Sequence, residues 1–427
     1  MRYGSKALIR IFLVIFLLVS INSCSNYSVK KIWEIKVLDS ADEENVFPMK
    51  LIPDTENNRI YANYASKLLC IDVSKGSRIW ELDADKDKAI FEFIFSGSDF
   101  FISLIPKQYP KDKPFSPSIA KVEIQTGKIL WNKEFSKSYS PIFLFLILEK
   151  ELMIAREGKC YVLNCFNGEI MNEYHFPQVS YKEAGASSWT ISERVFYEYL
   201  PVSKEIIRAK LPDFSNFGEN LRFKNIVLPD NLGLSLVRDG KILLTSSNHL
   251  ILGNENGEIL KNMKFEDIST AEFLHYFINL NNNYINPTIY KNYIFGNYFS
   301  TEKMKVESGF LIADFENGTY SKKKIEEVKL GEIAAKAKSS LFIWKDVLFL
   351  IYEEKMKDRS TLLAYSFPDL ELLSTISENT KFLEKRTLDD TDFPDPPYLF
   401  ANMETSNITG LIVSYSDRII FYAMNSK

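Results

Sequence analysis

The chain has 427 residues, 46% of them hydrophobic and 25% charged, a globular balance that excludes disorder as its main state. The 52 basic and 56 acidic residues give a formal charge of −4, and no large basic block stands out, so nucleic acid is not an expected partner. Three histidines and four cysteines leave little material for zinc sites or a Ser-His-Asp triad.

The N-terminal segment is organised like a secretory signal peptide. Arg2, Lys6 and Arg10 precede the apolar run 11–19, which is shorter than the ~20 residues that a transmembrane helix needs. The sequence Ile-Asn-Ser-Cys at 21–24 resembles the bacterial lipobox, in which the cysteine thiol receives a diacylglycerol before cleavage. The resemblance implies that Cys24 is lipidated and that a bacterial outer membrane holds the protein. An uncleaved membrane anchor is the alternative.

We therefore expect a signal peptide at 1–23, a short tether at 24–30 and a single domain at 31–427. Cleavage would leave Cys70, Cys160 and Cys165, an odd number that argues against a disulfide framework. Cys160 and Cys165 stand five residues apart on one predicted strand, so their side chains should face opposite ways. We expect these cysteines to be buried and free.

An internal repeat is the main signal in the chain. Segments 68–80 and 119–131 each read as a strand, a turn with a glycine and a second strand that ends at Trp80 or Trp131. A similar tryptophan strand surrounds Trp33. The same hairpin returns without tryptophan and with Gly168, Gly257 or Gly318 in the turn; two further hairpins use Pro-Asp, at 212–213 and 368–369.

Each hairpin follows another strand-like run, such as 59–66, 151–158 or 241–248, so the unit has about four strands. A repeat of roughly 40–60 residues with four strands is typical of a β-propeller blade. Eight third strands are predicted, near 68–73, 119–124, 160–165, 205–211, 249–254, 309–314, 361–366 and 418–424. The sequence thus predicts an all-β propeller of four-stranded antiparallel blades. Eight blades are favoured over seven, and a pair of β-sandwiches or a β-solenoid is the alternative fold.

The two ends of the chain complement one another. The third strand at 418–424 has no fourth strand after it, and the strand at 31–37 has no third strand before it. We expect 31–37 to become the outer strand of the C-terminal blade, which would close the ring and remove an open sheet edge.

The turn pattern resembles the quinoprotein-like (PQQ-like) repeat. The matching residues are Asp72, Gly76 and Trp80 in one unit, and Glu123, Gly127 and Trp131 in the next. The resemblance implies structural roles, in which the acidic side chain accepts backbone N–H groups of the turn and the tryptophan packs across two neighbouring blades. The motif therefore marks a fold, not an active site.

Cofactor and metal signals are weak. Quinoprotein dehydrogenases often carry an adjacent cysteine pair and a stacking tryptophan; this chain lacks the pair, and Trp189 and Trp344 alone stand outside repeat positions. The segment 83–88 lacks the glycine of a calcium loop, and the aspartates of 387–397 lack a second ligand set. We predict no catalytic, cofactor-binding or metal residues and no enzyme; a quinone-dependent oxidoreductase is the least favoured alternative.

Within the repeat class, the chain looks most like the lipoprotein propellers of the outer-membrane β-barrel assembly machinery. That resemblance rests on the leader, Cys24, the length and the repeat, and it implies a non-catalytic scaffold that binds a protein partner. The alternative is a glycan-binding, peptide-binding or sensory propeller, for which the Tyr-rich and Asn-rich segment 275–299 is a candidate surface.

Overall fold

The computed structural model of the chain describes residues 27–426 except 38–47, 65–66, 86, 108–112, 176–187, 193, 201, 217–219, 224–227, 229–231, 247, 266–269, 273–288, 303–304, 330–338, 355–358, 380–398, 405–408 and 416–417. Within these residues the regular elements are all β-strands. Among them, no helix has the length and apolar character to span a membrane.

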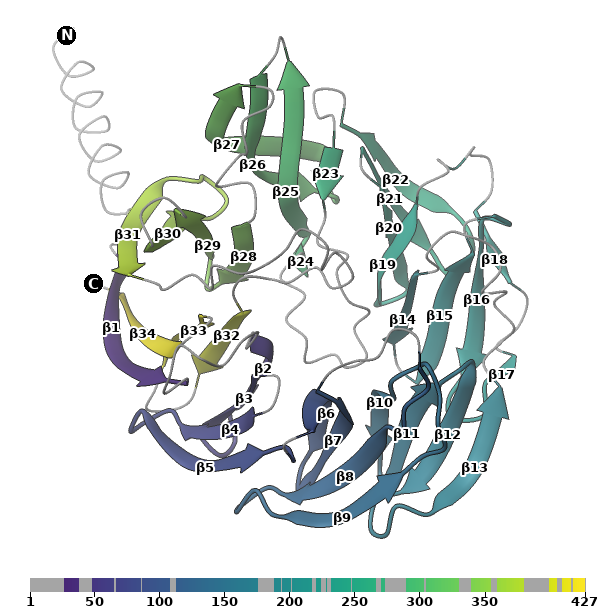
Figure 1. Ribbon diagram of the computed structural model, residues 1–427. Coiled ribbons are helices and arrows are strands. Elements are labelled where there is room, and N and C mark those ends of the chain that lie inside the picture. Colours follow the sequence, from purple (N-terminus) through teal and green to yellow (C-terminus); the bar gives the residue numbers. More distant parts are fainter. Residues whose placement is uncertain are drawn as a thin grey trace, which may run out of the picture.

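The strands form eight antiparallel sheets around a ring (Figure 1). The first blade contains β2 (Pro48–Asp54), β3 (Arg59–Tyr64), β4 (Lys67–Asp72) and β5 (Ser77–Asp83). The second contains β6 (Lys88–Ser96), β7 (Asp99–Pro106), β8 (Ser118–Glu123) and β9 (Ile129–Glu134). The third contains β10 (Phe143–Leu148), β11 (Glu151–Arg156), β12 (Lys159–Asn164) and β13 (Ile170–His175). The fourth contains β14 (Ser188–Ser192), β15 (Val195–Leu200), β16 (Glu205–Lys210), β17 (Ser215–Asn216) and β18 (Leu221–Arg222).

The remaining blades follow in chain order. The fifth contains β19 (Gly233–Arg238), β20 (Lys241–Thr245), β21 (His249–Asn254) and β22 (Ile259–Lys264). The sixth contains β23 (Thr270–Glu272), β24 (Ile289–Tyr290), β25 (Tyr293–Glu302), β26 (Lys305–Asp314) and β27 (Thr319–Lys329). The seventh contains β28 (Ser339–Trp344), β29 (Val347–Glu354), β30 (Arg359–Ser366) and β31 (Leu372–Asn379). The eighth contains β32 (Leu399–Glu404), β33 (Thr409–Ser414), β34 (Arg418–Ser426) and β1 (Tyr27–Lys36).

The structure confirms the predicted propeller with eight blades, so the seven-bladed, sandwich and solenoid alternatives are wrong. The eight predicted third strands correspond to β4, β8, β12, β16, β21, β26, β30 and β34. The predicted closure is also confirmed, because β1 pairs with β34 from Tyr27 opposite Ser426 to Lys36 opposite Arg418.

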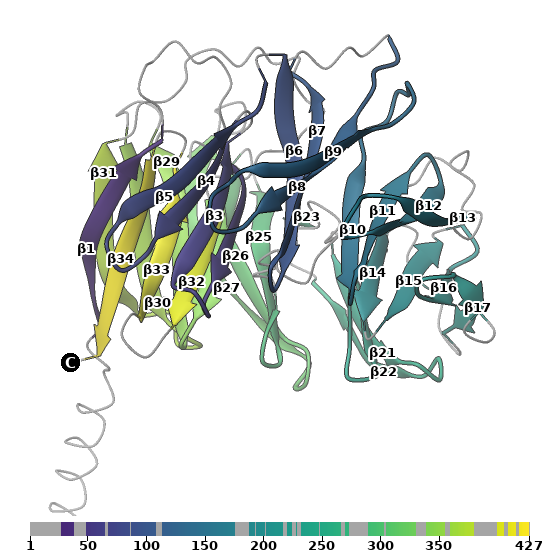
Figure 2. The same cartoon turned by 90° about the horizontal axis from the view of Figure 1, so that it is seen from below.

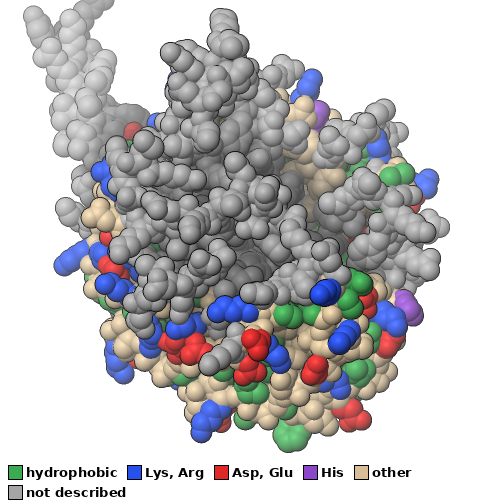
Figure 3. All heavy atoms as spheres, viewed as in Figure 1, with side chains coloured by type: hydrophobic (Ala, Val, Ile, Leu, Met, Phe, Trp, Pro, Cys, Tyr) green, Lys and Arg blue, Asp and Glu red, His purple; other side chains and the backbone are tan. Residues whose placement is uncertain are grey.

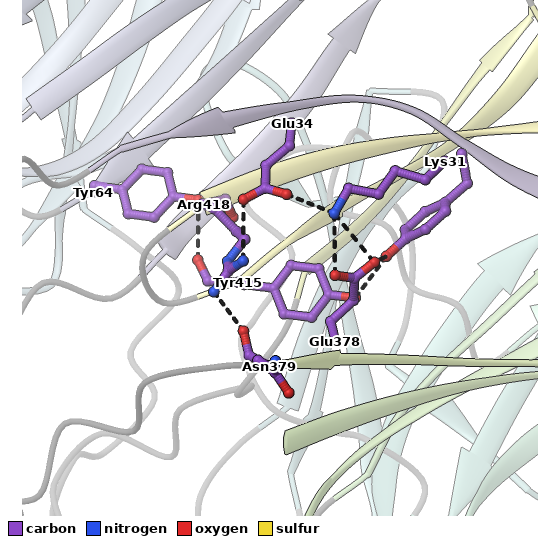
Figure 4. A network of polar contacts seen from close by, with 8 residues as sticks. Lys31, Glu34, Tyr64, Glu378, Asn379, Tyr415 and Arg418 are labelled. Atoms are coloured by element: carbon purple, nitrogen blue, oxygen red, sulfur yellow. Dashed lines mark hydrogen bonds and ion pairs between the residues drawn. The ribbon is translucent and has the colours of Figure 1, made fainter. Parts of the chain in front are cut away.

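A polar network reinforces this closure between the seventh and eighth blades (Figure 4). Lys31 Nζ lies 2.6 Å from Glu34 Oε2 in its own strand and 3.1 Å from Glu378 Oε2 of β31. Arg418 pairs with Glu34 at 3.0 Å and donates to the carbonyl of Asn379 at 2.6 Å. The N-terminal strand is therefore held by its sheet partner and by its neighbouring blade.

The core consists of eight apolar clusters, and each of them fills one interface between neighbouring blades. One cluster joins Phe349 of the seventh blade to Ile420 of the eighth, and another joins Ile412 of the eighth to Ile60 of the first. The buried side chains thus form a continuous ring in which every blade is packed on both faces.

Two blades depart from the four-strand pattern. In the fourth blade, β17 and β18 take the place of one outer strand and pair with opposite ends of β16. The segment after β16 contains Asn216, Gly218 and Asn220, residue types that strands disfavour. In the sixth blade the innermost strand is divided into β23 and β24, which both pair with β25.

The alternation of strand directions gives the ring two different faces. We call one the turn face; it carries the turns between third and fourth strands, such as 73–76, 124–128 and 165–169. We call the other the connection face; it carries the links between blades, such as 135–142, and the turns between second and third strands, such as 202–204. Figure 2 shows the end of β34 and the β21–β22 hairpin on the same side of the ring, which is the turn face.

Candidate functional site

The predicted lipidation residue, Cys24, lies outside the described residues. The first described residue, Tyr27, begins β1 beside the end of β34 on the turn face. Three residues of extended chain span at most ~10 Å.

The tryptophans of the repeat lie across blade interfaces. The indole Nε1 of Trp33 donates to the carbonyl of Val73 in the first blade at 2.7 Å. Trp80 repeats this contact one blade further on, to the carbonyl of Ile124 at 3.0 Å. Trp131 packs in the next interface against Gly168, but its buried Nε1 has no hydrogen-bond partner. Three consecutive interfaces therefore place an indole against the turn of the next blade, and two of them add a hydrogen bond from Nε1 to a backbone carbonyl.

The repeat glycines make room for these indoles. Gly76, Gly127 and Gly168 have φ angles of +61°, +74° and +71°, in the left-handed region that favours glycine. A Cβ built on Gly127 would stand 2.8 Å from the Trp80 ring, and one on Gly168 would stand 2.9 Å from Trp131. Backbone angle and space both require glycine here.

In blades that do not face a repeat tryptophan, the turn glycine lies beside a different residue. Gly257 and Gly318 also have positive φ angles, +78° and +73°. A Cβ on Gly257 would collide with the carbonyl oxygen of Arg222, whereas Gly318 has only Lys261 Cδ nearby, at 3.9 Å. Lys261 stands where the tryptophan stands in the first blades, so this interface keeps the turn and loses the stacked ring.

The acidic position of the repeat caps the turn. Asp72 Oδ1 accepts the N–H groups of Ser74 at 2.9 Å and Lys75 at 3.1 Å. Burial alone would raise the pKa of Asp72, but hydrogen bonds from Ser74 and Lys75 outweigh it and lower the pKa. Glu123 instead accepts the hydroxyl of Thr126.

Three later blades also have a residue that caps this turn, and the sequence analysis did not identify it. Asn164 accepts the N–H of Phe166 at 2.8 Å, and Asn254 accepts that of Asn256 at 3.0 Å. Asp314 accepts the N–H of Asn317 at 3.0 Å. Each residue precedes its turn glycine by three or four positions, and that spacing could have identified them from the sequence.

The cysteines fulfil the prediction of buried, free thiols. Cys70, Cys160 and Cys165 are all buried and unpaired. Cys160 packs between the third and fourth blades and Cys165 between the second and third, so their side chains do face opposite ways. Burial raises the pKa of each thiol to about 12, which makes them poor nucleophiles at neutral pH.

The remaining candidates from the sequence either pack inside the blades or lie outside the described residues. Tyr298 is fully buried, and the ring of Tyr293 lies 4.8 Å from that of Phe367, so the described tyrosines of 275–299 pack into blades. The aspartates of 387–397 lie outside the described residues, as does the side chain of Trp189. No group of three or more potential metal ligands occurs in the described part of the chain.

A buried ion pair that sequence analysis missed joins the innermost strands. Lys50 of β2 and Glu92 of β6 are 1% and 6% exposed, with Nζ 3.6 Å from Oε1. Lys50 also donates to the carbonyl of Phe93 at 2.5 Å, and Glu92 accepts the N–H of Leu144 at 2.9 Å. Burial lowers the pKa of Lys50 to about 8 and raises that of Glu92. The pair clamps three blades together and offers no accessible reactive group.

An exposed tyrosine stands on a well-supported loop of the connection face. Tyr139 is 62% exposed within the link 135–142, which we call the Tyr139 loop. Phe115 and Ser138 exchange backbone hydrogen bonds of 2.8 and 2.9 Å, and Phe135 donates to the carbonyl of Pro117 at 2.9 Å. Below the loop, the buried Arg156 donates to the carbonyl of Ser136 at 2.5 Å. The loop therefore presents its aromatic ring in a fixed backbone.

The surface around this loop is electrostatically mixed. Figures 1 and 3 look onto the connection face, and on its described part basic and acidic side chains alternate with small apolar groups. Lys113 and Lys137 are exposed near the Tyr139 loop, while Glu157 bonds to the hydroxyl of Ser138. The Tyr139 loop therefore combines one exposed aromatic ring with charges of both signs.

Comparisons with known proteins found only solved structures of low sequence identity. No family model and no curated protein matches the chain. The WD40 domain of SCAP from fission yeast is 8% identical with a TM-score of 0.49, over 93% of this chain and 98% of that one. BamB from Moraxella catarrhalis is 9% identical with a TM-score of 0.33, over 93% and 100%. The Neurospora crassa Pan2 WD40 domain is 9% identical with a TM-score of 0.40, over 94% and 97%.

Proposed function

We propose that this protein is a lipid-anchored, non-catalytic scaffold of the bacterial cell envelope that binds a protein partner on its connection face. The observation that carries the proposal is the Tyr139 loop. A tyrosine that is 62% exposed on a hydrogen-bonded loop offers a large, preordered contact surface at low entropic cost.

The position of the chain's N-terminal strand supports the same arrangement. Tyr27 begins β1 on the turn face, three residues after Cys24, whereas the Tyr139 loop lies on the opposite face. A lipid on Cys24 would hold the protein from one side and leave the other side open to a partner. In the proposal, that partner belongs to the machinery that assembles outer-membrane β-barrels.

Affinity capture from envelope membranes tests the binding surface. The lipidated wild type, Tyr139→Ala and Val202→Ala would be compared; Val202 is a matched control because it is 67% exposed on the same face but lies in the fourth blade. Truncation of a central tyrosine costs about 2 kcal/mol or more, so Tyr139→Ala should reduce capture at least about tenfold while Val202→Ala preserves it. Equal capture by all three variants would refute the site.

Two further outcomes address the remaining parts of the proposal. Binding of glycans to the Tyr139 surface, without any protein, would favour the glycan-binding alternative. For the anchor, Cys24→Ala should release the protein from the lipid-modified fraction, measured by metabolic labelling with an alkyne fatty acid. Unchanged labelling of Cys24→Ala would show that the cysteine is not the lipid site.

A further inference from the structure

The outer strands share an irregularity that the function proposed above does not use. In seven of the eight sheets, the register between the third strand and the outer strand shifts by one residue within the outer strand. The unpaired residue of each bulge is always aliphatic or methionine: Ile32, Ile79, Leu130, Met171, Leu260, Ile325 and Leu373.

Five of these bulge residues are exposed to solvent. Their exposed fractions are 50% for Ile32, 40% for Ile79, 56% for Leu130, 47% for Met171 and 44% for Leu260. A β-bulge removes a residue from the ladder and turns its side chain away from regular packing. Leu373 packs against the core between the seventh and eighth blades, but interior packing does not explain the apolar character of the five exposed positions.

Other exposed apolar residues extend the same band. Ile129, Ile170 and Leu372 begin their outer strands and are 45%, 39% and 56% exposed. Phe166, in the third-to-fourth turn of the third blade, is 85% exposed. Among the described large hydrophobic side chains, only Tyr139 and Val202 are exposed on the connection face. We call the nine exposed residues on outer strands and this turn the apolar band.

We infer that the apolar band rests on a phospholipid surface, so that the turn face is the membrane-facing side of the propeller. This inference rests on the proposed lipid anchor. The bulge opposes a corresponding part of the third strand in each blade, so these residues lie at a similar height around the ring. A globular partner would cover only an arc of the ring. The band spans six blades, from Ile32 in the eighth through Met171 in the third to Leu372 in the seventh.

Charged side chains flank the apolar residues of the band. Lys31, beside Ile32, pairs with Glu34 and Glu378. Arg78, beside Ile79, pairs with Glu81 at 2.6 Å. These two cations are paired within the protein, whereas Lys128 beside Ile129 and Lys261 beside Leu260 are exposed, so attraction to anionic lipid adds to insertion of the aliphatic side chains.

The buried native thiols allow a direct test by site-specific labelling. The full lipidated protein would be bound to vesicles of phosphatidylethanolamine and phosphatidylglycerol that contain a nitroxide-labelled lipid. A fluorophore would be attached to Leu130→Cys, Leu260→Cys or Leu372→Cys, which lie on well-separated blades. Val202→Cys is the matched control, because it is 67% exposed on the opposite face.

We expect the lipid nitroxide to quench the fluorophore at all three band positions at least about twofold and to leave position 202 unchanged. Quenching at none of the three, or at only one, while the protein floats with the vesicles would overturn the membrane-facing orientation. Protection of these positions only after envelope proteins are added would instead assign the band to a protein partner. Failure of the lipidated protein to float would refute the anchor, and the inference would fall with it.

Discussion

The repeat requires glycine at position 127 for two reasons, the positive φ angle and the lack of space for a Cβ. Replacement of Gly127 by alanine should allow the two costs to be measured separately. At φ +74°, a side chain costs about 1–2 kcal/mol from the left-handed backbone alone. The new Cβ would also stand 2.8 Å from the Trp80 ring, and overpacking of this kind costs about 1–3 kcal/mol. Gly127→Ala should therefore destabilise the protein by about 2–5 kcal/mol.

The same blade supplies the control. Gly97 has a φ of +57°, but a Cβ at this position would meet no heavy atom within 4 Å, so Gly97→Ala should cost only the backbone term of about 1–2 kcal/mol. Urea denaturation followed by circular dichroism measures both through the shift of the midpoint. In a Trp80→Ala background, Gly127→Ala should fall to the cost of Gly97→Ala. Equal costs for both glycines in the wild-type background would refute the steric part of the reasoning.

Three further predictions test the charges and the closure. Lys50→Met should lower the free energy of unfolding by about 3–5 kcal/mol, because it leaves Glu92 buried without its cation; a denaturation midpoint equal to that of wild type would contradict this. The lowered pKa values of Asp72 and Asp314 mean that their stabilisation is present above about pH 4 and is lost as the pH falls through the folded-state values. The Asp72→Asn, Asp314→Asn double variant should therefore have a lower free energy of unfolding than wild type at pH 7, and this difference should be smaller at pH 3. A difference that does not change with pH would exclude the mechanism. A chain without residues 27–36 should bind a hydrophobic dye and unfold at lower urea than one that begins at Tyr27, and identical unfolding curves would show that β1 does not close the ring.

The sequence alone was sufficient to predict the fold. The alternation of apolar residues, the turns around Gly76 and Gly127 and the spacing of Trp33, Trp80 and Trp131 are local patterns, and together they predicted eight third strands and their closure. These features could be predicted because strand periodicity and turn chemistry depend on residues only a few positions apart.

The buried ion pair and the Tyr139 loop depend on contacts between distant parts of the chain, which the sequence does not reveal. Lys50 and Glu92 meet because two innermost strands lie side by side, and no spacing in the sequence predicts that their pair is buried. The support of the Tyr139 loop likewise comes from Phe115 in the preceding loop and from Arg156 in the next blade.

The exposure of the bulge residues could not be predicted from the sequence. Leu130 and Met171 lie three positions after the turn glycines, and strand alternation alone does not show whether they are buried or exposed. The register shift beside the turn unpairs them and turns them outward, which depends on how the outer strand meets the third strand. The sequence determined which strands form and in what order, because these depend on local periodicity. Which apolar residues remain exposed at the rim cannot be read from local periodicity, because exposure depends on the packing of one blade against the next.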